Sequence, residues 1–255
     1  MGVAVVTGGA SGIGLAISDH LLQAGFDVAI ASLEAAEAIE PSLERLRRRG
    51  RLAYRRVDVA DTDGHAALVR DVESELGPIE CLVNNAGVTS LTRGDLLDLS
   101  VESFDRCLAV NLRGAFFLAQ RVARAMIESA RSDRAPVFRS IVNITSANAE
   151  ILGVDRADYC ISKAALSMAT RLFAARLAGE GIPVFEIRPG IVRTAMTAPA
   201  AEKYDRVIEG GGVPIARWGD PEDVGRVVAV VARGMIPYAT GEAIRVDGGL
   251  HLHRL

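Results

Sequence analysis

The feature that most constrains the fold of this chain is the repeated alternation of short β-branched runs with longer segments of helical period. The runs that we expect to form strands lie at residues 3–6, 27–31, 52–57, 81–84, 140–144, 184–187 and 243–246. The helical stretches between them lie at residues 13–24, 64–76, 100–127, 159–178 and 221–232. This alternation is typical of parallel strands joined by crossover helices. We therefore predict an α/β fold, a doubly wound and mostly parallel seven-stranded sheet with helices on both faces.

Composition and charge narrow the class of protein further. No Pro-, Gly- or Ser-rich linker divides the chain, so we expect residues 1–255 to form a single domain. The 29 Lys and Arg against 32 Asp and Glu give a net charge of -3, without the basic footprint of a nucleic-acid-binding protein. With no secretory signal pattern and no apolar run of about 18 to 20 residues, we expect no membrane span and a cytoplasmic location. Three cysteines, Cys81, Cys107 and Cys160, suit small buried hydrophobes in a reducing compartment.

The segment TGGASGIG, residues 7–14, stands between the first expected strand and the first expected helix. Gly8 permits a tight turn, and Gly12 and Gly14 let the backbone approach a pyrophosphate. A helix that opens near Ile13 directs its free amides and the positive end of its dipole toward that anion. In this context the segment predicts a dinucleotide-binding turn. The alternative is a tight strand-to-helix turn without a ligand.

Polar residues and glycines also follow several other expected strands. They are Asn84-Asn85-Ala86-Gly87, Thr145-Ser146 and Arg188-Pro189-Gly190. In an open parallel sheet, ligands bind beyond the carboxyl ends of the strands. The sequence therefore predicts that one edge of the sheet carries the functional site.

Tyr159 and Lys163 stand four positions apart in an expected helix, so they share one face. A free tyrosine titrates near a pH of about 10, too high for ready proton exchange at neutral pH. A nearby ammonium favours the phenolate and lowers the tyrosine pKa. The pair therefore predicts a tyrosine that gives or takes a proton, with an ordinary surface pair as the alternative.

Taken together and in this order, the motifs resemble those of the short-chain dehydrogenase/reductase family, whose members have a single-domain Rossmann sheet. Residues 7–14 match its TGxxxGxG turn, residues 84–87 its NNAG and residues 159–163 its YxxxK. Ser146 stands 13 residues before Tyr159, where the family has a catalytic serine. Asn111 matches the asparagine that completes the tetrad. The resemblance extends essentially from end to end of the chain.

The resemblance implies hydride transfer between a nicotinamide and a carbonyl or secondary alcohol. Tyr159 would exchange the proton of the substrate oxygen, and Ser146 would donate a hydrogen bond to that oxygen. Lys163 would hold the cofactor ribose and depress the tyrosine pKa. Asn111 would hold a water that connects Lys163 to solvent, or serve as a structural asparagine.

The resemblance also assigns residues to the cofactor pocket. These are Gly8, Ser11, Gly12, Ile13, Gly14, Ser32, Asp58, Val59, Asn85, Ala86, Gly87, Tyr159, Lys163, Pro189, Gly190, Val192 and Thr194. An acidic residue at the end of the second strand would repel the extra phosphate of NADP. Ser32 stands at that position, so we lean towards NADP and keep NAD open.

The end of the chain, residues 217–249, resembles the β-ketoacyl-(acyl carrier protein) reductase branch, which acts in fatty acid biosynthesis. A small-molecule or acyl-carrier-bound carbonyl compound is thus the expected substrate. Arg93, Arg193 and Arg217 are candidates for a basic patch that docks an acidic carrier. A sugar, polyol or other secondary-alcohol dehydrogenase is the alternative, followed by an isomerase or dehydratase and a non-catalytic dinucleotide-binding protein.

Three further expectations concern loops, assembly and metals. The long stretch at residues 190–218 is expected to be a substrate loop that closes over the site. The resemblance implies a homotetramer, with the helices at residues 100–127 and 159–178 as candidate interfaces. His251 and His253 have no carboxylate or cysteine partner in the sequence pattern, so we expect no metal site.

Overall fold

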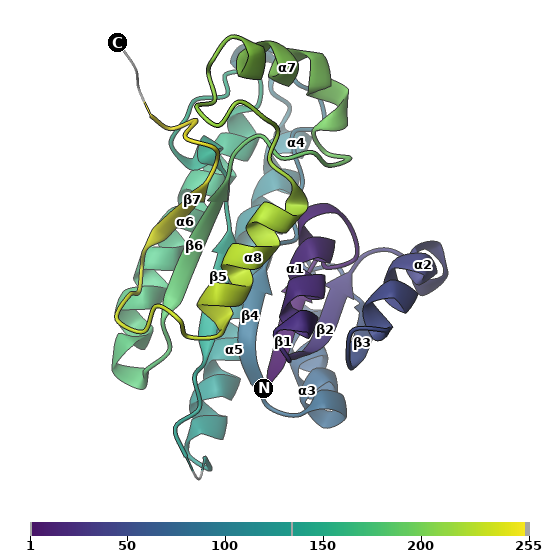
Figure 1. Ribbon diagram of the computed structural model, residues 1–255, viewed down its shortest axis with the longest axis vertical. Coiled ribbons are helices and arrows are strands. Elements are labelled where there is room, and N and C mark those ends of the chain that lie inside the picture. The colour runs from purple at the N-terminus through teal and green to yellow at the C-terminus, as the bar shows by residue number, and fades with distance from the viewer. Residues whose placement is uncertain (1, 134, 253–255) are drawn as a thin grey trace.

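The computed structural model describes residues 2–133 and 135–252, and its strands form one seven-stranded sheet in the order β3-β2-β1-β4-β5-β6-β7 (Figure 1). Every neighbouring pair of strands is parallel. This confirms the predicted fold class. The strands are β1 (Val3–Thr7), β2 (Asp27–Ser32), β3 (Leu52–Arg56), β4 (Ile79–Asn84), β5 (Ser140–Ile144), β6 (Val184–Pro189) and β7 (Ala243–Val246).

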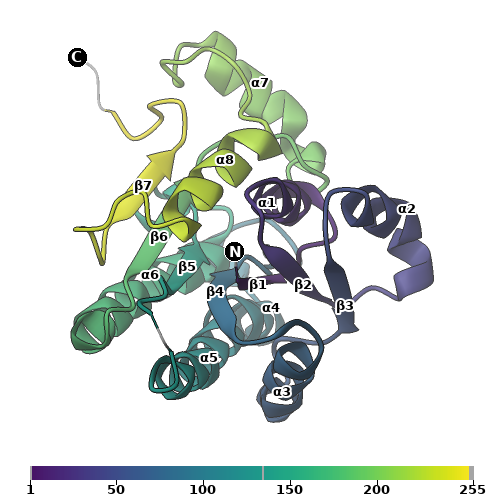
Figure 2. The same ribbon diagram turned by 60° about the horizontal axis from the view of Figure 1, so that its bottom comes forward.

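Helices cover both faces of the sheet, as Figure 2 shows. One face packs against α1 (Gly12–Gln23), α2 (Ala36–Arg47) and α8 (Pro221–Ala232). The other packs against α3 (His65–Leu76), α5 (Ala115–Ala130) and α6 (Ala157–Leu177). Because both faces are covered, β1, β5 and β6 are buried at every position.

The helix α2 is absent from the sequence expectations. Its segment is rich in charge and contains Pro41, which lacks the amide that a helix interior uses. Burial overrides this local preference, because Leu43 and Leu46 are fully buried in the core on that side of the sheet.

The single helix expected at residues 100–127 is also corrected by the structure. It is divided into α4 (Val101–Leu108), a π-helical turn (Ala109–Gly114) and α5. The turn comes close to the loop that follows β3, where a Cβ on Gly114 would lie 2.4 Å from the carbonyl oxygen of Val59. π-Helical turns inside helices are frequent at functional sites, and this one contains the fully buried Asn111.

The strand order reverses between β1 and β4, which is where open α/β sheets bind their ligands. Above this edge lies α7 (Ala201–Glu209), at the top of Figure 1. The helix belongs to the stretch expected to be an irregular loop, and it has a small core of its own around Tyr204 and Trp218. Their rings meet edge to face with centroids 5.7 Å apart. Among the described residues, the structure has no helix that is long and apolar enough to span a membrane.

Candidate active site

A cavity of about 610 Å³ opens at the carboxyl edge of the sheet, between the loops that follow the strands and α7. Every residue predicted to contact the cofactor lines this cavity. Of the four predicted catalytic residues, Ser146, Tyr159 and Lys163 line it too. Asn111 lies behind the wall, with none of its surface exposed.

The turn at residues 7–14 requires glycine at two positions below the cavity. Gly8 has a φ of +62°, in the left-handed region that favours glycine. A Cβ on Gly14 would lie 2.0 Å from the carbonyl oxygen of Gly8, which is impossible without moving the main chain. The side-chain amide of Asn85 fixes this turn by donating to the carbonyl oxygens of Thr7 and Gly8, at 2.9 and 3.1 Å.

The start of α1 and the end of β2 each offer polar groups to a ligand. Among the described residues, no side chain caps the first turn of α1, because Ser11 makes no capping hydrogen bond. Its amides are thus available to an anion. The buried Ser32 hydroxyl at the end of β2 likewise has no hydrogen-bond partner in the described part of the chain. The uncapped amides of α1 fit the phosphates of a nucleotide, and the buried Ser32 hydroxyl fits its ribose.

The tyrosine and lysine of the YxxxK motif lie where α6 meets the cavity. Tyr159 is 8% exposed and Lys163 is 4% exposed. The Lys163 ammonium lies 5.7 Å from the centre of the Tyr159 ring and donates to the carbonyl oxygen of Ile144 at 2.9 Å. Ser146 follows β5, and its hydroxyl accepts a hydrogen bond from the amide of Asn148 at 3.1 Å. The pair is therefore buried against the site instead of lying on the surface.

Burial shifts the pKa values of both groups against their charged forms. It raises the pKa of Tyr159, although the Ser146 hydroxyl and the Arg156 charge act to lower it. Burial also lowers the pKa of Lys163 to about 8. Loss of hydration outweighs the favourable charges, so the pKa of Tyr159 lies above its ordinary value. The expected lowering of this pKa by the Lys163 ammonium stays a prediction.

Both the oxygen and the nitrogen of the Asn111 side-chain amide form hydrogen bonds. Its carbonyl oxygen accepts from the amide of Val88 at 2.8 Å, and its nitrogen donates to the Val88 carbonyl and the Ser162 hydroxyl, each at 2.9 Å. It thereby fastens the loop after β4 to α6. These contacts support the structural alternative for Asn111, and the expected contact with water stays a prediction.

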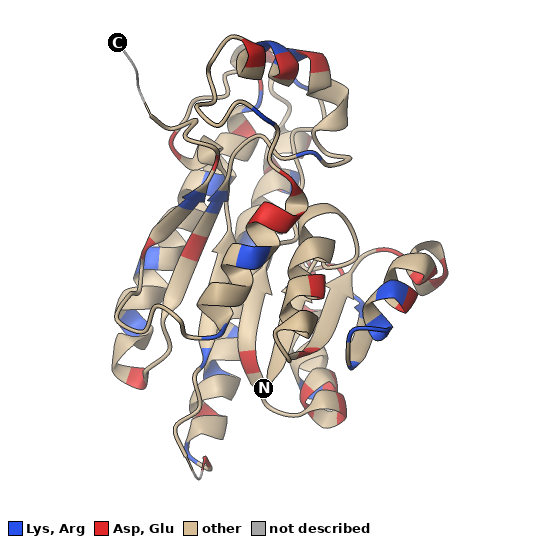
Figure 3. Cartoon of the chain, in the orientation of Figure 1, with Lys and Arg blue, Asp and Glu red and all other residues tan. Residues whose placement is uncertain are grey.

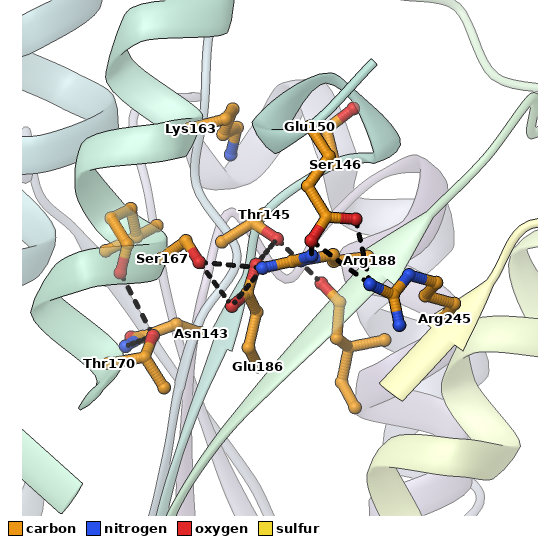
Figure 4. A network of polar contacts seen from close by, with 12 residues as sticks. Asn143, Thr145, Ser146, Glu150, Lys163, Ser167, Thr170, Glu186, Arg188 and Arg245 are labelled. Atoms are coloured by element: carbon orange, nitrogen blue, oxygen red, sulfur yellow. Dashed lines mark hydrogen bonds and ion pairs between the residues drawn. The ribbon is translucent and has the colours of Figure 1, made fainter. Parts of the chain in front are cut away.

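A buried polar network lies directly under Ser146, as Figure 4 shows. Its centre is Glu186 of β6, which is 1% exposed. The Glu186 carboxylate accepts from the hydroxyls of Thr145 and Ser167, at 2.6 and 2.8 Å, and from the Arg188 guanidinium at 2.6 Å. The network therefore ties the end of β5 to β6 and α6.

The same network continues to the segment that follows Ser146. Arg188 forms a second ion pair with Glu150, and Arg245 of β7 donates to Glu150 at 2.8 Å. The strands β6 and β7 and the segment 145–150 are thus joined through charged side chains. Sequence reasoning missed this network, since Arg245 and Glu150 are 95 positions apart.

A second buried carboxylate, Asp158, stands beside the tyrosine and was also missed. It has no exposed surface and accepts hydrogen bonds from the hydroxyls of Ser90 and Ser103 and from the amide of Tyr159. Burial alone would raise its pKa, but these hydrogen bonds outweigh it and hold the pKa below its usual value. Asp158 thereby fixes the start of α6, where a negative charge also suits the helix dipole.

The three arginines expected to form a carrier-docking patch each make a contact within the protein. Arg193 stacks over the Trp218 ring at 4.7 Å, and Arg217 pairs with Asp223 at 2.7 Å. Arg93 instead lines the cavity and lies 3.7 Å from the Asp155 carboxylate. A shared basic patch therefore stays a prediction.

His251 is bound to the buried carboxylate of Asp247, with Nδ1 and the oxygen 2.7 Å apart. His253 lies outside the described residues. Within residues 2–133 and 135–252, no three His, Cys, Asp or Glu side chains gather as metal ligands.

Comparisons with known proteins agree with this geometry. A family model described as enoyl-(acyl carrier protein) reductase matches residues 8–251. The (3R)-3-hydroxyacyl-CoA dehydrogenase of Rattus norvegicus is 35% identical, over 98% of this chain and 96% of its own. The 2-dehydro-3-deoxy-D-gluconate 5-dehydrogenase of Dickeya dadantii is 34% identical, over 97% and 94%.

Among solved structures, a 3-oxoacyl-[acyl-carrier protein] reductase from Brucella melitensis in complex with NAD superimposes with a TM-score of 0.94. It is 48% identical in sequence, and the match covers 99% of this chain and 98% of that one. The family match spans nearly the whole chain, and it includes the glycine turn, the serine and the tyrosine–lysine pair that line the cavity. The chain belongs to the short-chain dehydrogenase/reductase family.

Proposed function

We propose that the protein is an NAD(P)-dependent oxidoreductase that interconverts a carbonyl compound and the corresponding secondary alcohol. The observation that carries this proposal is the shared cavity: Ser146, Tyr159 and Lys163 line the same space as the uncapped start of α1. A nicotinamide dinucleotide bound there would supply the hydride donor or acceptor. The amides after Gly12 would hold its phosphates, and Lys163 its ribose.

The side chains around Tyr159 then act on the substrate oxygen. Ser146 donates a hydrogen bond to that oxygen and stabilises the charge that develops on it. Tyr159 gives the oxygen a proton in the reductive direction and takes it back in the oxidative direction. The neighbouring Lys163 lowers the cost of the phenolate that remains after the proton has left.

The choice between NADP and NAD depends on the end of β2. The lean towards NADP rests on Ser32 in place of an acid. The structure adds an opposing contribution, because the carboxylates of Glu34 and Asp58 line this part of the cavity. A phosphate on the adenosine ribose would face these negative charges, so both nucleotides belong in the assay.

For the substrate, the first candidate is a β-ketoacyl group on acyl carrier protein, supported by the 48% identity to the Brucella melitensis reductase. The second candidate is a sugar acid, polyol or other secondary alcohol, supported by the Dickeya dadantii relative. The segment 190–218, with α7 above the cavity, is proposed to close over the bound substrate.

A homotetramer is proposed on the basis of an apolar groove of about 890 Å³ between α5 and α6. Phe117, Met168 and Leu172 line it and are 44%, 48% and 59% exposed. A second copy that covers these side chains would remove apolar surface from water.

The decisive experiment replaces the proton-transferring group. Tyr159→Phe is expected to lower kcat by about 10²- to 10⁴-fold, because removal of a general acid–base group costs rate in that range. Turnover is followed by the absorbance of the reduced nicotinamide, and nucleotide affinity by calorimetry. Affinity is expected to stay within a few fold, since the ring is retained.

The fully exposed Tyr238 provides the matched control, and Tyr238→Phe is expected to leave turnover unchanged. Unchanged turnover in Tyr159→Phe as well, with every accepted carbonyl compound, would remove the basis of the proposed mechanism.

A further inference from the structure

Four charged side chains gather at the part of the cavity that contains Tyr159. They come from three separate elements: Arg93 from the loop after β4, Asp155 and Arg156 from the segment before α6, and Lys203 from α7. All four line the cavity. Figure 3 shows that α7, above this edge, carries charges of both signs.

The charges of this cluster do not balance. The Asp155 carboxylate lies 3.1 Å from the Lys203 ammonium and 3.7 Å from Arg93 Nη1, so one acid serves two cations. Arg156 makes no ion pair within the described part of the chain, and its buried Nε has no hydrogen-bond partner there. Three cations against one carboxylate leave a surplus of two positive charges. Half-buried surplus charge of this kind is costly unless an anion binds to it.

Arg156 is also the cation of this cluster that packs over the Tyr159 ring. Its guanidinium carbon lies 5.4 Å from the centre of the Tyr159 ring. A guanidinium binds an anionic oxygen at about 2.8 Å, often with two parallel hydrogen bonds. An anion held by Arg156 would therefore lie in the part of the cavity that also contains the Tyr159 ring.

We propose that Arg156, assisted by Arg93 and Lys203, binds an anionic oxygen group of the substrate, a carboxylate or phosphate, within a few bonds of the reacting carbon. The inference rests on the proposed reaction. It favours the second class of substrate given above over the first, and specifies short keto acids, hydroxy acids or their phosphorylated counterparts. A β-ketoacyl thioester carries no charge so close to its carbonyl. The phosphate of a carrier arm lies at the far end of that arm, too distant for Arg156.

The test compares substrates that differ only in charge. Wild-type protein is assayed with a short keto acid, its methyl ester, a phosphorylated hydroxyketone and a short β-ketoacyl thioester. We expect the acid or the phosphate ester to have the higher kcat/KM. In Arg156→Gln, kcat/KM for that anionic substrate is expected to fall about 10- to 100-fold, as for the loss of hydrogen bonds to a charged group. The methyl ester is expected to change less than about threefold.

Three further variants separate binding from folding and from effects on Tyr159. Arg156→Lys, which keeps the charge, is expected to recover part of the lost kcat/KM. Lys203→Gln, whose side chain is 52% exposed, gives a smaller loss in the same direction without a risk to folding. Arg206→Gln on the exposed face of α7 serves as the control and changes neither substrate.

The outcomes distinguish this inference from the proposed function. If no carbonyl compound of either charge is reduced, the proposed reaction itself fails. If carbonyl compounds are reduced but Arg156→Gln lowers kcat/KM equally for the acid and the ester, Arg156 acts only through Tyr159 and the anion site is disproved. Preference of the wild type for the thioester over both anionic substrates also overturns the inference.

Discussion

The cavity has a dinucleotide end, at the glycine turn, and a substrate end, at Tyr159, and different parts of the chain form the two ends. At the dinucleotide end, the glycine turn brings main chain to the cavity, and the carbonyl of Gly8 lies where a Cβ on Gly14 would have to go. At the substrate end, the wall rests on charged side chains, Glu186 and Arg188 beneath it and Arg156 within it. We therefore expect stability and nucleotide binding to depend on the absence of added atoms at the glycine turn. At the substrate end, we expect stability to depend on the charges of the side chains.

The largest effect is expected where an atom is added to the dinucleotide end. Gly14→Val is predicted to lower the free energy of unfolding by about 4 kcal/mol or more, because the main chain of the turn has to move. Nucleotide binding is predicted to be lost with it. Urea unfolding and calorimetric titration with NAD and NADP measure the two effects.

Gly179 offers the matched control, since a Cβ there would have no described atom within 4 Å. Gly179→Val is expected to change stability by less than about 1 kcal/mol. Normal nucleotide binding by Gly14→Val would show that the close contact with Gly8 does not set the shape of the turn.

A smaller effect is expected where charge is removed from the substrate end. Glu186→Gln leaves the Arg188 guanidinium without its buried counterion, and we predict a loss of about 3 kcal/mol in the free energy of unfolding. Glu150, whose side chain is 46% exposed, also pairs with Arg188, and Glu150→Gln is predicted to cost about 1 kcal/mol or less. Equal losses for the two variants in urea unfolding would contradict the difference between the buried and exposed parts of this network.

The same difference in construction explains what could be predicted from the sequence. The glycine turn and the tyrosine–lysine pair each lie within eight residues, and their spacing follows from main-chain geometry and helical period. These local patterns predicted the sheet edge, and the cavity lies there. The contacts of Glu186 could not be predicted in this way, because its partner Thr145 is 41 positions away and meets it only in the folded sheet.

The missed elements have the same cause. The helix α2 forms around Pro41 because Leu43 and Leu46 are buried by other parts of the chain. The π-helical turn at Asn111 depends on contacts with the loop after β4 and with α6. Local sequence preference does not depend on such distant contacts, so it predicts a continuous helix at residues 100–127.

Lys163 lies where the two ends of the cavity meet, and its burial predicts a pH dependence of stability. The unfolded chain keeps the lysine proton up to a pH of about 10.5, whereas the folded protein releases it above about 8. Between these values the unfolded state binds more protons at this lysine, so Lys163 makes a contribution to folded-state stability that increases as the pH rises. One proton contributes at most about 1.4 kcal/mol for each pH unit, the smallest of the effects considered.

The measurement compares the free energy of unfolding of the wild type and Lys163→Met between pH 8 and pH 10. Tyr159 has its pKa raised by burial and opposes the trend only above pH 10. Burial raises the pKa values of Cys81 and Cys107 to about 12, so both oppose the trend within the window, but they do so in the wild type and in the variant. The difference between the two proteins therefore reports the lysine. The variant lacks the titrating group, and its stability relative to the wild type is expected to decline as the pH rises. Two parallel curves would mean that Lys163 keeps its ordinary pKa in the folded protein, and that the junction between the two ends is more hydrated than its 4% exposure implies.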